Sequence, residues 1–450
     1  MRLLCHFEGT QYIACGEVLI AVNPKITADL QQFEFPSGKG SQIIAVTVSL
    51  DGKFVYAGYA NKHICCWSTT TRELLGSVLH SKRPTAIVYM ESGTNQNSLV
   101  VSDKAGLIWG MDVPLFKKQV LLAGHTASVI TDMVTNGIVI ASADRDEKVR
   151  ISNFPRMDTI QAFCMAHTNV VTSISFMEHD NEQILLSCGW DHRLCMWNSS
   201  NGKTYDVLQY DVPGSDSSSA GSSNSVSVSA TANIVEAIAE NITSSDPEGT
   251  SINAATAVDI DIDADVEGDA EGDATEKTYD EDSAGHYPVK IVASPNSSLV
   301  AVIFKNHSSV KIYNIKSNKS SKHGFGTEII KELSAVPCDL CFTSSNELIV
   351  LLPKPFFMQI FSLEIIGDCE SAIVEVNDFD DKLKIIEKFQ DTCNNQGFEF
   401  TQQLVSTEDG VDAEKGTNFF FICDRRLFSR LFENSSLLSF LFLHFPAILF

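Results

Sequence analysis

The sequence has no apolar run long enough to cross a membrane and no amphipathic helical stretch of any length. A membrane-spanning helix needs about 20 apolar residues. The apolar stretch Leu437–Phe450 is shorter and is interrupted by His444 and Pro446. The N-terminal residues also lack the apolar core of a secretory signal. We therefore expect no membrane partner, and the missing helical pattern favours an all-β fold.

Cysteine is present but without the regular spacing of a disulfide framework. The 12 cysteines are scattered, mostly inside apolar runs, which indicates a reducing compartment. Cys338 and Cys341 have CxxC spacing, but in a strand residues three apart point to opposite faces. No second Cys/His pair stands nearby to complete a zinc site. We expect these cysteines to be structural.

Cofactor and metal motifs are also missing. No glycine-rich loop follows a strand, and there is no βαβ pattern for a dinucleotide-like cofactor. An aspartate series beginning at Asp261 resembles a calcium loop, but Val266 stands where glycine is needed and Gly272 where glutamate is needed. The sequence therefore predicts no cofactor site and no metal site.

Negative charge is concentrated in one block. The formal net charge is −24, but residues 211–286 contain 18 Asp/Glu and one Lys, so the remaining chain carries −24 − (−17), or −7. Ser215–Ser229 adds a serine-rich, low-complexity stretch. Such composition is typical of a solvated, disordered segment. We expect residues 206–287 to be an acidic insertion into a folded domain.

Repetition is the main positive signal. Several segments end in similar strands, of which Asn61–Trp67 and Asp191–Trp197 are the clearest. Their shared final position is occupied in order by Val22, Trp67, Met111, Ser152, Trp197, Tyr313 and Phe361. The spacings are 45, 44, 41, 45, 116 and 48 residues. WD-type repeats are about 40–45 residues long, so the long step contains one repeat plus the acidic insertion.

Seven such positions predict an all-β, seven-bladed WD-repeat β-propeller, a fold that protects sheet edges by radial repetition. We expect N-terminal blades in residues 1–205 and C-terminal blades in 288–425, with 426–450 an apolar tail. For the last blade we expect a strand at Asn418–Cys423, with the N-terminal strands available to close the ring.

Histidine, serine and aspartate recur in a way that superficially suggests a hydrolase triad. His167, Ser187 and Asp191 precede Trp197, and His125, Ser142 and Asp146 have similar offsets. An active site occurs once, whereas a fold element recurs, and no Gly-x-Ser-x-Gly motif is present. We interpret these residues as the hydrogen-bonded structural tetrad of WD repeats and expect no catalytic residues.

One turn is unusually rich in charge for a propeller. The segment Ala141–Arg150 contains Arg145, Glu147, Lys148 and Arg150. Lys104 lies at the corresponding turn of the preceding repeat. Because adjacent blades present equivalent turns side by side, we expect Lys104 and Arg145 to be neighbours. A solvated turn with weak local ion pairs is the alternative interpretation.

The string Ser142–Ser152, together with Ile160–Cys164 and Val101–Gly106, resembles the WD-repeat non-catalytic subunit of tRNA (guanine-N7)-methyltransferase. The resemblance covers roughly residues 40–205. It implies a heterodimer with a Rossmann-like catalytic subunit that holds S-adenosylmethionine and forms 7-methylguanosine in the tRNA variable loop. It also implies a nuclear location, with the cytoplasm as a second possible location, and contact with tRNA through the complex.

By the same resemblance, Lys104, Arg145, Glu147, Lys148 and Arg150 form the interface with the catalytic subunit. Arg150 is the first choice for pairing with a partner carboxylate, and Glu147 is expected to orient it. The C-terminal segment departs from the family because Arg425, Arg426 and Arg430 are its few basic residues. A WD-repeat adaptor of a ubiquitin ligase or chromatin complex, and an enzyme built on a propeller, remain as alternatives.

Overall fold

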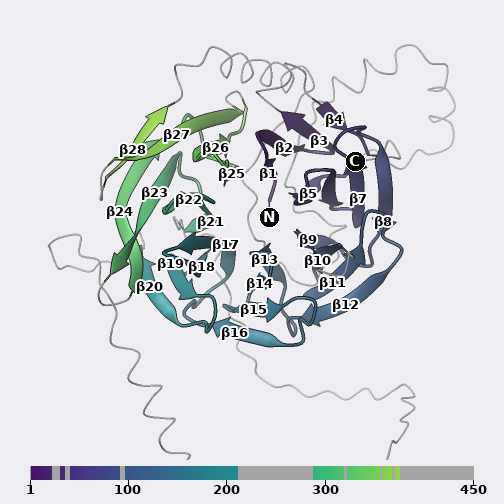
Figure 1. Ribbon diagram of the computed structural model, residues 1–450, viewed down its shortest axis with the longest axis horizontal. Coiled ribbons are helices and arrows are strands. Elements are labelled where there is room, and N and C mark those ends of the chain that lie inside the picture. The colour runs from purple at the N-terminus through teal and green to yellow at the C-terminus, as the bar shows by residue number, and fades with distance from the viewer. Residues whose placement is uncertain are drawn as a thin grey trace, which may run out of the picture. The chain divides into compact units, whose positions relative to one another are not determined.

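The computed structural model describes residues 2–22, 31–35, 41–91, 97–210, 287–318, 322–354, 357–366 and 370–375. Within these ranges 28 strands form seven four-stranded sheets. All strand pairs within the sheets are antiparallel, and the sheets stand around a ring (Figure 1). The predicted seven-bladed all-β propeller is confirmed.

The first strand of every blade lies nearest the centre of the ring (Figure 1). These strands are β1 (Leu4–Phe7), β5 (Ile43–Val48), β9 (Pro84–Met90), β13 (Ile130–Thr135), β17 (Val171–His179), β21 (Pro288–Ala293) and β25 (Asp339–Phe342). Each contacts the first strand of the next blade, and β25 contacts β1. Nearly all their residues are buried, as in β9, because both faces of each sheet are covered by neighbouring blades.

The second and third strands are also apolar and buried. The second strands are β2 (Thr10–Cys15), β6 (Phe54–Tyr59), β10 (Ser98–Asp103), β14 (Val139–Asp144), β18 (Glu182–Gly189), β22 (Leu299–Phe304) and β26 (Glu347–Leu351). The third strands are β3 (Val18–Val22), β7 (His63–Ser68), β11 (Leu107–Asp112), β15 (Val149–Asn153), β19 (Arg193–Asn198), β23 (Ser309–Asn318) and β27 (Met358–Ile366). All seven repeat positions identified in the sequence lie on third strands.

The outer strands form the rim of the ring. They are β4 (Gln31–Phe33), β8 (Leu74–Leu79), β12 (Gln119–Gly124), β16 (Ile160–Cys164), β20 (Thr204–Gln209), β24 (Lys322–Glu332) and β28 (Glu370–Glu375). In β8, β12 and β16 most residues are exposed or half-buried. Several exposed apolar side chains lie on these edges, including Leu79 and Leu121.

The ring closes differently from the expectation. The N-terminal strands β1–β4 form a complete sheet of their own, and β25–β28 form the last one. The carboxylate of Asp339 on β25 joins the two, because its Oδ2 accepts hydrogen bonds from the backbone N–H groups of Leu3 at 2.7 Å and Leu4 at 3.1 Å. The strand expected at Asn418–Cys423 lies outside the described residues, as does the tail at 426–450.

The insertion separates the fifth and sixth blades. Strand β20 continues to Gln209, past the expected boundary at residue 205, and β21 begins at Pro288. Residues 211–286 lie outside the described ranges. In the described part of the chain, no helix is long and apolar enough to span a membrane. Nine cysteines of that part, including Cys338 and Cys341, carry free thiols.

Candidate partner-binding site

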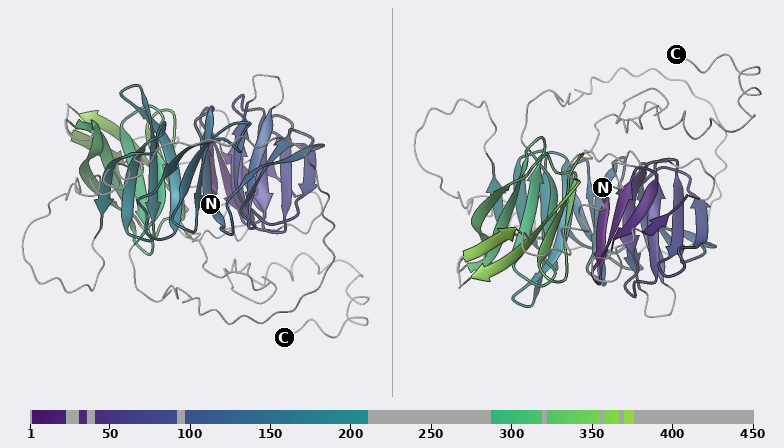
Figure 2. Two further views of the ribbon diagram at one scale, coloured as in Figure 1. Left: turned by 90° about the horizontal axis from the view of Figure 1, so that it is seen from below. Right: turned by 90° about the horizontal axis from the view of Figure 1, so that it is seen from above.

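Successive turns of an antiparallel blade alternate between its two ends, which are the two faces of the ring (Figure 2). One end contains the connections between blades, with His80, His125 and His167, together with the turns between second and third strands. We call it the His end. The opposite end contains the turns between first and second strands and between third and fourth strands.

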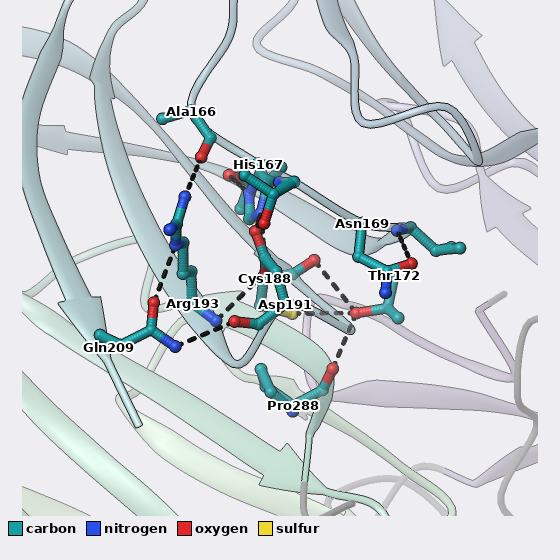
Figure 3. Close-up of polar contacts among 12 residues, drawn as sticks. Ala166, His167, Asn169, Thr172, Cys188, Asp191, Arg193, Gln209 and Pro288 are labelled. Atoms are coloured by element: carbon teal, nitrogen blue, oxygen red, sulfur yellow. Dashed lines mark hydrogen bonds and ion pairs between the residues drawn. The ribbon is translucent and has the colours of Figure 1, made fainter. Parts of the chain in front are cut away.

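The fifth blade contains a complete tetrad at the His end. His167 Nδ1 hydrogen-bonds to the Asp191 carboxylate at 2.9 Å, and His167 Nε2 hydrogen-bonds to Ser187 Oγ at 2.7 Å. The indole Nε1 of Trp197 donates to the same Ser187 oxygen at 2.8 Å. The His167 and Asp191 side chains are almost wholly buried. Figure 3 labels His167 of the inter-blade loop and Asp191 of the turn between β18 and β19, which are joined by the hydrogen bond between their side chains.

In the fourth blade the assignment of Asp146 to the tetrad is wrong. His125 Nδ1 hydrogen-bonds to Asp144 Oδ2 at 2.8 Å, and its Nε2 hydrogen-bonds to Ser142 Oγ at 2.8 Å. Asp146 lies two residues farther on, and its carboxylate is 3.6 Å from Arg145 Nε at the surface. The aspartate that contacts the histidine therefore comes from the end of β14 rather than from the turn.

Gly189 explains why the two blades differ. It occupies in β18 the position that Asp144 occupies in β14, since Cys188 pairs with Leu194 as Ala143 pairs with Val149. A Cβ atom at Gly189 would lie 2.6 Å from the Val170 carbonyl oxygen and 3.1 Å from the Asp191 carboxylate. Without a side chain at this position, the carboxylate two residues later reaches the histidine.

Replacing Gly189 by alanine is therefore expected to destabilise the propeller by about 1–3 kcal/mol, because overpacking forces backbone shifts. The carbonyl oxygen of Val170 belongs to the backbone and cannot move aside as a flexible side chain would. Urea unfolding of the full chain measures the change. The control is Ser200→Ala at the exposed surface. A second glycine such as Gly137 is unsuitable, because its positive φ would itself make alanine destabilising.

The third blade has a third version of this arrangement that the sequence patterns did not reveal. His80 Nε2 lies 3.3 Å from Asp103 Oδ2, and the Trp109 indole donates to the same oxygen at 3.0 Å. Burial opposes ionisation of Asp103, yet hydrogen bonds led by that of His80 hold its pKa below the usual value. The sequence feature that could have revealed this arrangement is Asp103 itself, which ends a second strand at the same position as Asp144.

The predicted charged turn lies between β14 and β15. Its backbone is fixed internally: Arg145 N donates to Val129 O at 3.0 Å, and Lys148 N donates to Asp144 Oδ1 at 2.9 Å. Glu147 has a positive φ of 72°, which glutamate seldom adopts. The side chains of Arg145, Glu147 and Lys148 are partly exposed. The turn thus holds its charged groups at the surface on a rigid frame.

Arg150 is placed differently from its neighbours. Its Nη1 donates to the carbonyl oxygen of Gly124 at 2.7 Å, and its guanidinium lies over the Phe163 ring at 5.6 Å from the centroid. The expectation that Glu147 orients Arg150 toward a partner carboxylate stays a prediction. Arg193 of the fifth blade binds the Ala166 carbonyl in the same way at 2.6 Å (Figure 3). Arg150 therefore has a structural task of its own.

Lys104 lies on the turn of the third blade and is exposed. Its turn packs on the loop His125–Val129, because His125 N donates to Gly106 O at 2.8 Å. Arg145 bonds to the other end of that same loop, at Val129. The structure thus brings the Lys104 and Arg145 turns onto one five-residue loop. We call Lys104, Arg145, Glu147 and Lys148 the charged turn surface.

Two further basic residues extend this surface and were missed in the sequence. Lys82 and Arg83 follow His80 in the preceding inter-blade loop, and Lys104 N donates to Arg83 O at 2.9 Å. Lys82 is exposed, while burial lowers the pKa of Arg83. The signal available in the sequence was a pair of basic residues that begins two positions after the loop histidine His80.

Apolar side chains accompany the charges on the outer edge of the fourth blade. Phe163 is 43% exposed and Met165 is 68% exposed. Phe163 is also the ring on which Arg150 rests. An exposed aromatic and a methionine beside fixed charges have the composition of a protein-binding surface, where such residues are enriched.

Comparison with known proteins supports the resemblance. Residues 110–248 match the family described as the tRNA methyltransferase TRM82 WD40 domain. The chain is 28% identical over 205 residues to the tRNA (guanine-N(7)-)-methyltransferase non-catalytic subunit wdr4 of Xenopus laevis, covering 45% of this chain and 51% of that protein. It is 30% identical over 245 residues to the subunit wuho of Drosophila grimshawi, covering 47% of this chain and 62% of that protein.

Solved structures support the fold alone. A chain in the crystal structure of the mitotic checkpoint complex has a TM-score of 0.52 at 13% identity, covering 78% of this chain and 84% of that one. The RRP9 WD40 repeats have the same TM-score and identity, covering 77% and 84%. The resemblance first suggested by the charged turn is therefore confirmed: this WD-repeat propeller is similar to the non-catalytic subunits of tRNA (guanine-N7)-methyltransferase.

Proposed function

We propose that this chain is the non-catalytic scaffold subunit of a heterodimeric tRNA (guanine-N7)-methyltransferase. It binds and stabilises the catalytic subunit during 7-methylguanosine formation in the tRNA variable loop. The match spans about half of the Xenopus relative. The activity and partner are therefore carried from that relative to this chain as part of the proposal.

The observation that carries the proposal is the construction of the charged turn surface. The backbone N–H groups of Arg145 and Lys148 are bonded to the Val129 carbonyl and the Asp144 carboxylate, so the shape of the turn does not depend on the side chains of Arg145, Glu147 and Lys148. Arg145, Glu147 and Lys148 present their charges on a preorganised frame. Preorganisation lowers the entropic cost of association, because little ordering remains to be done on binding.

The apolar edge supplies the second element of the interface. Phe163 and Met165 lie on the outer side of the same blade as the charged turn. In protein interfaces, apolar anchors surrounded by polar residues contribute most of the binding energy. A catalytic subunit that covers this edge side-on places acidic side chains opposite Arg145 and Lys148.

The catalytic chemistry belongs to the partner. S-adenosylmethionine is held by the catalytic subunit, and the propeller contributes no cofactor ligand and no catalytic residue. The buried His, Ser and Asp of the tetrads satisfy one another, which suits a structural role. The complex acts in the nucleus.

Contact with tRNA occurs through the complex. At the His end, Lys82 and Lys104 are exposed, and basic groups near a bound phosphate backbone make affinity depend on salt. The acidic insertion lies outside the described residues.

Reconstitution tests the proposal directly. The catalytic subunit, this chain, and the two together are assayed for methyl transfer from labelled S-adenosylmethionine to tRNA. We expect activity in the presence of both chains and none from this chain alone. Activity of the isolated propeller would contradict the non-catalytic role. In a pull-down with this chain, recovery of a ubiquitin-ligase subunit without any methyltransferase would favour the adaptor alternative.

A further inference from the structure

Two hairpins from neighbouring blades meet at the end of the ring opposite the His end. The first joins β17 to β18 through Asp180 and Asn181, and the second joins β23 to β24. Strands β17 and β18 have nine and eight residues, whereas the equivalent β13 and β14 have six each. Strands β23 and β24 have 10 and 11 residues. Both hairpins are therefore long, and they are in contact, because Ser317 of the second hairpin hydrogen-bonds to Asp180 of the first.

Metal-ligating side chains gather where these hairpins touch. His179 and Asp180 come from the first hairpin and His323 from the second. One ligand atom of each lies within 4.8 Å of those of the other two. The imidazole rings of His179 and His323 are 5.3 Å apart, and His323 is fully buried. His179 Nε2 lies 3.6 Å from Asp180 Oδ2.

A buried nitrogen of His179 needs an explanation. Its Nε2 is inaccessible to solvent and makes no hydrogen bond within the described chain. Buried polar atoms of this kind normally have a protein, water or ion partner. Burial and the neighbouring His323 lower the pKa of His179, while Asp180 opposes them.

We propose that His179, Asp180 and His323 bind a divalent transition-metal ion of the zinc type, which cross-links the fifth and sixth blades. Two imidazoles and a carboxylate are a ligand set that zinc accepts. Zinc–ligand bonds of about 2.0–2.2 Å place tetrahedral ligands roughly 3.3–3.6 Å apart. The separations of up to 4.8 Å therefore need only a small contraction of the three side chains.

Surrounding groups support this arrangement. Glu182 Oε2 lies 3.1 Å from His323 Nε2, and a carboxylate on the outer nitrogen of a histidine orients the ring for metal binding. The Tyr205 hydroxyl donates to the same oxygen at 2.9 Å, and Lys322 pairs with the other oxygen. The hydrogen bond from Lys322, with those of His323 and Tyr205, lowers the pKa of Glu182 to about 2.

The position of the cluster indicates that a bound ion would stabilise the contact between the fifth and sixth blades. The fifth and sixth blades are the pair separated by residues 211–286, whereas short loops join the other described neighbours. A longer connection increases the entropy lost when its ends are brought together. A metal bridge between the two hairpins would hold these blades in contact independently of the intervening chain.

Zinc titration of the full chain tests the proposal. After chelation and dialysis, ZnCl2 alone is titrated and followed by calorimetry and thermal unfolding. We expect one equivalent to bind tightly and to raise Tm by roughly 3–8 °C at saturation, as for a ligand that binds the folded state alone. Cobalt in place of zinc is expected to give the visible spectrum of tetrahedral coordination.

Two variants assign the site without altering the buried His323. Asp180 has a φ of 51°, and asparagine adopts this conformation readily, so Asp180→Asn removes a ligand without backbone strain. We expect Asp180→Asn and His179→Gln each to weaken zinc binding at least about tenfold while metal-free Tm changes little. His63→Gln, at a partly exposed histidine of the second blade, should leave zinc binding unchanged. Equal binding by wild type and both site variants, or no rise in Tm with zinc, would overturn the proposal.

Discussion

Exchanging Arg145 and Lys148 together for glutamate is expected to abolish co-purification of the chain with the catalytic methyltransferase subunit. Both side chains extend from a turn whose backbone hydrogen bonds they do not make. The exchange therefore reverses two charges without removing either of these backbone hydrogen bonds. Opposing a partner carboxylate with a new negative charge costs several kcal/mol in a desolvated interface. We expect an affinity at least about 100-fold lower.

The double exchange is a sharper test than a change at Arg150. The Arg150 guanidinium binds the Gly124 carbonyl and rests on Phe163. Replacing it would disturb the blade itself, so lost binding would have two explanations. Arg145 bonds through its backbone to Val129, and that bond survives the exchange.

A matched control is available at the opposite end of the ring. Lys117 and Lys118 are exposed and lie in the turn between β11 and β12. Their exchange for glutamate changes the net charge by the same amount as the Arg145 and Lys148 pair. We expect this control to keep the complex and its tRNA methylation. An intact complex with the Arg145 and Lys148 variant at moderate salt would show that the charged turn surface is not the interface.

The repeat pattern predicted most of the fold because it depends on local sequence. Each blade must bury its third strand between two neighbours, so that position repeats at a near-constant spacing. The seven residues from Val22 to Phe361 all lie on third strands for this reason. The acidic block was equally visible, since its composition cannot form a buried strand.

The predictions that were wrong concern three-dimensional geometry, which the spacing of residues along the sequence does not specify. Asp146 and Asp144 both lie near the end of a second strand, and the absence of a side chain at Gly189 decides which aspartate position reaches the histidine. Ring closure was also mispredicted. The contact of Asp339 with Leu3 joins residues 336 positions apart, and no local pattern predicts such a pair.

The charged turn could be identified in the sequence because its composition is unusual. The different structural roles of its basic residues could not be predicted. Arg145, Lys148 and Arg150 look alike in sequence, whereas one of them is bound to the blade through Gly124. Lys82 and Arg83 escaped notice because they belong to a loop of ordinary composition. Their place beside Lys104 follows from a backbone hydrogen bond between blades.

Replacing Asp339 by alanine is expected to lower the free energy of unfolding by about 3–5 kcal/mol. The carboxylate is 1% exposed and accepts hydrogen bonds from the backbone N–H groups of Leu3 and Leu4. Lys290 Nζ, which is also buried, lies 3.9 Å away from it. Alanine leaves the buried N–H donors of Leu3, Leu4 and Leu340 without this acceptor and removes one negative charge from beside the buried Lys290 ammonium group.

A second aspartate on a first strand also accepts hydrogen bonds from the first strand of another blade. Asp132 on β13 accepts hydrogen bonds from Ser173 Oγ at 3.0 Å and Ile174 N at 3.1 Å on β17. Burial would raise the pKa of Asp132, yet the Lys290 charge and the bond from Ile174 keep it below the usual value. Both aspartates therefore connect the first strand of one blade to the first strand of another. At Asp339 the connection closes the ring.

The closing role makes Asp339 distinguishable from an ordinary buried carboxylate. If it holds the two ends of the propeller together, loss of its carboxylate should release β1 before the remaining blades unfold. We expect hydrogen exchange of the Leu3 and Leu4 amides to accelerate in Asp339→Ala under conditions where β17 and β18 stay protected. Asp339→Asn keeps an acceptor oxygen and should lose roughly half as much stability. Asp158→Ala, at a side chain 67% exposed, should change stability by less than about 0.5 kcal/mol. Uniform acceleration of exchange in every blade would mean that Asp339 stabilises the core generally and that closure depends on other contacts between β25 and β1.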